Sequence, residues 1–131
     1  MPLLDLSALM PLAATLGIET VVATKDEVRL RLAWRPDLCT SGGVLHGGAL
    51  MALADSCAAA SAVLNLPEGA TTSTIESKTN FLRPVREGVV TAVARPLHAG
   101  RTVIVVQTDL LDEAGRRVAQ TTQTQAVLRP V

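Results

Sequence analysis

The sequence predicts an α+β fold in which an antiparallel sheet of five to six strands wraps around one long helix. One observation is an Ala-rich apolar run without a helix breaker over residues 49–64. The other is a series of later segments that read as strands and are joined by short links. A helix that is apolar on almost every side must be covered, and a curled sheet can cover it. The length of 131 residues fits a single domain, 1–131.

The expected elements follow in order along the chain. Residues 5–16 have apolar positions at mixed helical spacing, and Pro11 limits them to a short or broken helix. Two strands are expected before the long helix, and residues 28–34 alternate between apolar and mostly charged side chains as a half-buried strand does. Four glycines indicate a loop over residues 40–48. The later strands are expected at residues 71–82, 89–97, 102–111 and 117–128.

Composition excludes several classes of partner. The formal net charge is zero and aromatic residues make up 2%, with Trp34 and Phe81 alone, so no nucleic acid is expected to bind. No run reaches the about 20 apolar residues of a membrane span, so no membrane partner is expected. Cys39 and Cys57 lack the spacing of a zinc or redox site and are expected to be reduced thiols in a cytoplasmic protein. Low net charge favours a homo-oligomer.

Two features indicate chemistry. Leu45-His46-Gly47-Gly48 opens the apolar helix, and glycines there leave backbone N–H groups accessible at the positive end of the helix dipole. Asp55 follows His46 by nine positions and has almost only alanine, leucine and methionine around it on the helix. Together they suggest an oxyanion site and a carboxylate that serves it. The alternatives are a simple turn into the helix and a solvated surface aspartate.

Other catalytic patterns are missing from the sequence. It has no GxSxG elbow, no HExxH pair and no Lys-Ser/Thr after the glycines, which argues against a serine hydrolase, a zinc protease and a phosphate loop. No cluster of residues is spaced as metal ligands are, so no metal is expected.

These residues resemble a known family. Leu45-His46-Gly47-Gly48, then Ala52-Leu53-Ala54-Asp55 and Asn80-Phe81-Leu82-Arg83-Pro84, are similar to the hotdog-fold acyl-CoA thioesterases of the PaaI type from the phenylacetate pathway. The stretches 83–88 and 96–101 also look like the proofreading thioesterase of enterobactin synthesis. The resemblance covers residues 33–128 and implies hydrolysis of an aryl- or medium-chain acyl-CoA thioester.

The resemblance also implies roles for individual residues. The Gly47 N–H would polarise the thioester carbonyl with His46 close by, and Asp55 would be either the nucleophile or the general base for water. In such dimers these two elements come from different subunits, so a homodimer would form the sites, and two dimers would pair as a tetramer. Substrate-binding positions would be Thr40, Gly48, Met51 and Thr74. Coenzyme A, which is part of the substrate and not a cofactor, would contact Phe81, Arg83, Pro84, Arg86, His98, Gly100, Arg101 and Thr102.

Two positions depart from the family pattern. Many relatives have Asn or Gln where this chain has Thr40, and some have Thr or Ser where it has Ala59. The side-chain amide is therefore replaced by a shorter hydroxyl at position 40, and the hydroxyl at position 59 is missing. Coenzyme A and an acyl-carrier protein share the same pantetheine arm, and both remain open as carriers of the thioester. A non-catalytic acyl-CoA-binding module is the main alternative, and a hydratase or dehydratase would need a different arrangement of histidine and acid.

Overall fold

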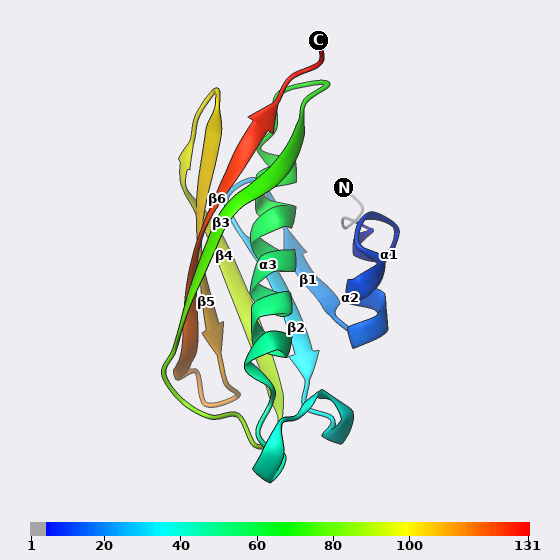
Figure 1. The fold of residues 1–131 in the computed structure, drawn as a ribbon, viewed down its shortest axis with the longest axis vertical. Coiled ribbons are helices and arrows are strands. Elements are labelled where there is room, and N and C mark those ends of the chain that lie inside the picture. The colour runs from blue at the N-terminus through cyan, green and yellow to red at the C-terminus, as the bar shows by residue number, and fades with distance from the viewer. Residues whose placement is uncertain (1–4) are drawn as a thin grey trace.

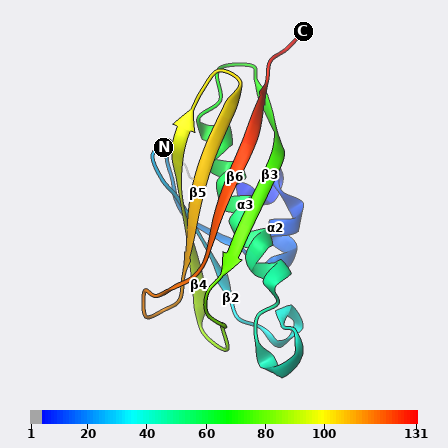
Figure 2. The same ribbon diagram turned by 60° about the vertical axis from the view of Figure 1, so that its left-hand side comes forward.

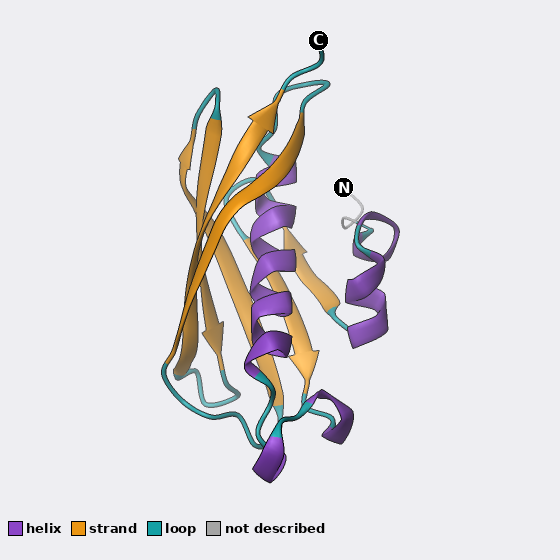
Figure 3. Ribbon diagram, in the orientation of Figure 1, coloured by secondary structure: helices purple, strands orange, loops and turns teal. Residues whose placement is uncertain are grey.

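A six-stranded antiparallel sheet curves around one long helix, α3 (Gly47–Leu64), in a computed structural model that describes residues 5–131 (Figures 1 and 3). Residues 1–4 lie outside the described residues. The sheet order is β1-β2-β4-β5-β6-β3, so β1 and β3 are its edges. This confirms the predicted α+β fold. The strands are β1 (Glu19–Ala23), β2 (Val28–Ala33), β3 (Thr71–Phe81), β4 (Val89–Ala99), β5 (Val103–Leu111) and β6 (Arg117–Leu128).

The concave face of the sheet forms the core against α3. In β5 every second side chain, including Ile104, Val106 and Leu110, is fully buried, which is the period of two that a half-buried strand requires. Leu53 and Ala54 of α3 are equally buried. Small side chains on this helix let the strands approach it closely, so the Ala-rich composition is a packing requirement of the fold.

The helix begins two residues earlier than the sequence predicts, at Gly47 instead of Ala49. It was also expected to be buried on most sides, but only half of its 18 residues are buried in the single chain. By length and composition α3 could cross a membrane, yet its buried half packs on the sheet as the core helix of a folded domain does. The open side includes Gly48, Met51 and Asp55.

The N-terminal segment forms two short helices beside α3 (Figure 2). They are α1 (Leu6–Leu9) and α2 (Pro11–Leu16), and the break falls at Met10 because Pro11 starts a new helix at its first position. Gly17 ends α2 in the left-handed conformation, with φ of 76°. The chain then enters β1. Ala13 is buried in the core, so this segment covers one flank of α3.

Candidate active site

The N-terminus of α3 is built around His46. Its backbone is extended, with φ of −60° and ψ of 134°, and its Nδ1 accepts a hydrogen bond of 2.8 Å from the Gly48 N–H. The ring is therefore the N-cap of the helix, and in the neutral ring the proton lies on Nε2. A Cβ atom at position 48 would lie 2.9 Å from Nδ1, so Gly48 leaves room for this cap.

Gly47 is the first residue of the helix and lies under the Phe81 ring. A Cβ at this position would meet Phe81 Cζ at 3.2 Å. Within residues 5–131 the Gly47 N–H donates to no protein acceptor, since the first two intrahelical bonds to the His46 carbonyl come from Ala49 and Leu50. It is an available donor at the positive end of a helix dipole.

A hollow of about 420 Å³ opens beside this amide. Leu50, Leu82 and Val85 give it an apolar wall. It brings together five of the sequence-predicted site residues, which are Thr40, Gly47, Phe81, Arg83 and Pro84. Gly47 therefore borders a space in which an acyl group and the start of a thioester arm can lie.

Loops hold this hollow in place through hydrogen bonds from distant parts of the chain. The Leu45 N–H donates to the Val85 carbonyl at 2.8 Å, and Trp34 Nε1 donates to the Gly43 carbonyl at 3.0 Å. Arg86 reaches the Gly42 carbonyl at 3.3 Å. The glycine-rich loop, which contains a 3₁₀ turn at Ser41–Gly43, is thereby fixed against the β3–β4 connection.

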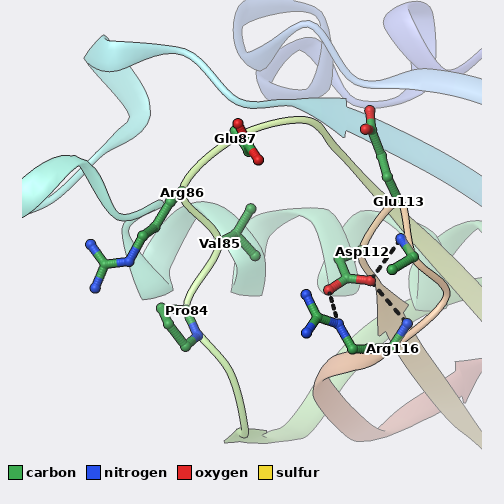
Figure 4. Close-up of a pocket in the computed structure, with 8 residues that line it drawn as sticks. Pro84, Val85, Arg86, Glu87, Asp112, Glu113 and Arg116 are labelled. Atoms are coloured by element: carbon green, nitrogen blue, oxygen red, sulfur yellow. Dashed lines mark hydrogen bonds and ion pairs between the residues drawn. The ribbon is translucent and has the colours of Figure 1, made fainter.

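Arg86 also borders a second hollow, of about 320 Å³, between the β3–β4 loop and the β5–β6 turn (Figure 4). There the Arg116 backbone N–H and guanidinium hold the pKa of the Asp112 carboxyl below its usual range. Figure 4 shows Arg86 directed away from this pair. Its guanidinium contacts a backbone carbonyl and, among residues 5–131, no carboxylate, so its positive charge can serve an anion.

A third hollow, of about 340 Å³, lies on the α2 side of the helix terminus. Its wall is mostly apolar, and His46 and Gly48 border it. The His46-Gly47-Gly48 element therefore stands between two hollows. Met51, expected to bind substrate, is 40% exposed and lines neither of them in the single chain. The other residues that line the third hollow are Leu12, Leu16, Asp37, Leu38, Cys39, Ala49 and Ala52.

Asp55 lies on the open side of α3, about two turns beyond Gly47. Its Oδ1 accepts a hydrogen bond of 2.9 Å from Gln123 Nε2, on β6. Gln123 is fully buried, and sequence reasoning missed it. One signal was available in the sequence. Polar residues occupy every second position of β6 on its buried face, at Thr121, Gln123 and Gln125.

Thr74 is held in the same way by the neighbouring glutamine. Gln125 Nε2 donates to Thr74 Oγ1 at 2.8 Å, and the Thr72 hydroxyl donates to Gln125 Oε1 at 3.0 Å. Gln123 and Gln125 are two positions apart and so point to the same face of β6. This face thus holds both Asp55 and Thr74, the acid and the hydroxyl singled out from the sequence.

The remaining predicted coenzyme A residues lie elsewhere. Gly100, Arg101 and Thr102 form the β4–β5 turn and His98 lies at the end of β4 beside it, at the opposite end of the sheet from the α3 N-terminus (Figure 1). β4 has 11 residues, which separates this turn from the β3–β4 loop by roughly 30 Å. One chain therefore does not bring the two groups of predicted coenzyme A residues together. A Cβ at Gly100 would lie 2.5 Å from His98 Nε2, so the glycine makes room for the present position of the His98 ring.

Comparisons with known proteins agree with this arrangement. The family model described as Thioesterase superfamily matches residues 42–119, from the glycine-rich loop to β6. A Bacillus subtilis protein named "Putative esterase ComA2" is 37% identical over 120 residues, which are 90% of this chain and 94% of that protein. The 1,4-dihydroxy-2-naphthoyl-CoA hydrolase of Escherichia coli is 36% identical over 86 residues, 66% of this chain and 63% of that protein.

Solved structures show the same fold. A thioesterase from Haemophilus influenzae superposes with a TM-score of 0.87 at 32% identity, covering 98% of this chain and 93% of the other. A mutant thioesterase from Pseudomonas aeruginosa gives a TM-score of 0.90 at 30% identity, covering 98% and 95%. The sheet wrapped around α3 and the glycine-rich N-terminus of that helix together define a hotdog-fold thioester hydrolase. The chain belongs to the Thioesterase superfamily.

Proposed function

We propose that this protein hydrolyses an acyl-CoA thioester, with an aryl or medium-length acyl group, to the free acid and coenzyme A. The observation that carries the proposal is the Gly47 N–H, which has no acceptor within the described residues and belongs to a residue that lines a largely apolar hollow at a helix N-terminus. A carbonyl oxygen placed there gains a hydrogen bond that strengthens as negative charge develops on it.

The reaction needs one further group, and Asp55 supplies it. As general base, the carboxylate takes a proton from water while the water oxygen bonds to the carbonyl carbon. As nucleophile, it bonds to that carbon itself, and water later hydrolyses the anhydride. In both routes the carbon–sulfur bond breaks, the thiolate of coenzyme A leaves and takes up a proton, and the acid is released. No cofactor is needed, because coenzyme A is part of the substrate.

Gly47 and Asp55 of one chain cannot serve the same carbonyl carbon. They are eight positions apart on one helix, which places their backbones about 12 Å apart along its axis. We therefore propose that a second copy completes each site, with Gly47 from one subunit and Asp55 from its partner. β3 supports this arrangement, because it is an edge strand with Ile75 63% exposed, and unpaired strand edges readily pair with another chain.

Relatives support the choice of acyl group. The Escherichia coli relative is named a hydrolase of 1,4-dihydroxy-2-naphthoyl-CoA, and a solved structure from Ralstonia eutropha, 27% identical with a TM-score of 0.83, is titled as related to phenylacetic acid degradation. Both names point to aromatic acyl groups, which the apolar walls of the two hollows at the helix terminus would accommodate. Arg83 and Arg86 are the proposed phosphate contacts at this end of the sheet.

The experiment is a thiol-release assay with aryl, short, medium and long acyl-CoA esters. Saturable turnover of aryl or medium esters that disappears in Asp55→Asn supports the proposal. Saturable binding without release of free thiol would favour the acyl-CoA-binding module instead. Turnover that is unchanged in Asp55→Asn would contradict the role of the carboxylate.

A further inference from the structure

Gln123 is an unusual residue for its position. Its side chain is fully buried on the concave face of β6, where the core is otherwise built mainly from aliphatic side chains. Its amide makes one hydrogen bond to another side chain, from Nε2 to Asp55 Oδ1 at 2.9 Å, and Oε1 has no partner within the described residues. A buried acceptor without a partner lowers the stability of the fold.

The amide is therefore in the core for a reason other than stability. An apolar side chain of similar length, such as methionine, would fill the same volume without an unpaired oxygen. What only the amide supplies is an N–H aimed from the rigid sheet at the one carboxylate on α3. Buried polar groups that lower the stability of a fold are typical of functional sites.

We propose that Gln123 is a positioning residue for the hydrolysis: it holds Asp55 Oδ1 and thereby presents Oδ2 to the reacting water or thioester. Without this bond an exposed aspartate on a helix samples several side-chain rotamers. With it, Oδ1 is fixed to the sheet, and Oδ2, which accepts no hydrogen bond within residues 5–131, is left for the reaction. This inference rests on the proposed function and adds a residue whose role lies in orientation.

The test is Gln123→Met, assayed for thiol release and for thermal unfolding. The expected result is a kcat lower by about tenfold to a hundredfold with KM nearly unchanged, because misplacing a reacting group by about 1 Å has effects of this size. The midpoint of unfolding is expected to stay the same or rise, since the unpaired Oε1 is removed. Should the Gln123→Met protein misfold, Gln123→Leu serves in the same assays.

A matched control is Thr108→Val. The Thr108 hydroxyl, on the neighbouring strand β5, is also fully buried and has no hydrogen-bond partner in the described part of the chain, the site residues included. This variant is expected to keep kcat while it leaves the unfolding midpoint unchanged or higher. A loss of kcat in Thr108→Val equal to that in Gln123→Met would overturn the inference, because any substitution in this layer of the core would then lower kcat.

A double variant separates orientation from structure. In the Asp55→Asn background, Gln123→Met is expected to cause no further loss of rate, because there is no carboxylate left to orient. An additional loss there, or an unchanged kcat in the single variant, overturns the inference. If the unmodified protein releases no thiol from any ester, the proposed function is wrong and the role of Gln123 is wrong with it. If the unmodified protein is active and Gln123→Met leaves kcat unchanged, only the inference about Gln123 is wrong.

Discussion

Gly47 and Asp55 lie on the same helix, eight positions apart, with the amide of one bordering a hollow and the carboxylate of the other held by β6. The axial separation of about 12 Å is several times the reach of a hydrogen bond. Each chain thus carries both proposed catalytic groups but cannot apply them to one carbonyl.

Replacing Asp55 by asparagine should lower turnover strongly without unfolding the protein. The amide oxygen of asparagine can still accept the hydrogen bond from Gln123, so the midpoint of thermal unfolding should change little. The rate should fall by about 10²- to 10⁴-fold, because asparagine can act neither as a base nor as a nucleophile. Thiol release measured beside a thermal melt checks both statements, and an active variant would remove Asp55 from the mechanism.

The Gly47 amide can be tested with a matched pair of variants. Gly47→Pro removes the N–H, and proline suits the first position of a helix after an extended residue such as His46. Gly47→Ala adds a Cβ near the Phe81 ring but keeps the N–H. The proline variant should lose about 10²- to 10³-fold in kcat, as expected for one oxyanion donor. Similar rates for the alanine and proline variants would show that the hydrogen of this amide is not used.

The two cysteines should differ in reactivity. Burial raises the pKa of the Cys57 thiol to about 12, so almost no reactive thiolate exists near neutral pH. Cys39 is partly exposed at the hollow under α2. Iodoacetamide at pH 8 followed by peptide mass spectrometry should find Cys39 modified and Cys57 untouched in the folded protein. Equal labelling would mean that the core opens far more readily than its packing implies.

A charge cluster on the sheet should make stability depend on pH. Glu27 pairs with Arg29 and Arg95, and the hydrogen bond from Arg29 is the main reason that the pKa of Glu27 is lowered in the folded protein. A carboxyl with a lowered pKa stabilises the fold above its ordinary value of 4.5, and this contribution disappears as pH falls through the lowered value. Glu27→Gln should therefore lower the unfolding midpoint at pH 7 and have a smaller effect near pH 3. The same difference at both pH values would contradict this origin.

The strands could be predicted because their alternation and short links are local features. The expected strand bounds agree with the structure within two residues. The start of α3 was placed two residues late, since Gly47 and Gly48 read as loop. Only the structure shows that His46 caps the helix and that Gly48 makes room for its ring.

The site was only partly accessible from sequence. Five of the predicted residues, from the loop, the helix terminus and the end of β3, line one hollow, and their role in binding stays a prediction. Gln123 was missed because a glutamine in a Thr/Gln-rich strand reads as a surface residue, and its burial depends on the direction in which β6 faces. The long separation of the β4–β5 turn from the helix terminus follows from strand length and sheet order, which motif spacing does not show.

The most direct measurement is complementation between two inactive variants. Asp55→Asn chains retain the Gly47 amide, and Gly47→Pro chains retain the Asp55 carboxylate. Purified separately, each should be nearly inactive. After subunits are exchanged, confirmed by recovery of both tags in one assembly, random mixing of dimers should restore about a quarter of the wild-type rate, because half the dimers then hold one intact site of two. Confirmed exchange without any regained activity would show that each chain builds its site alone.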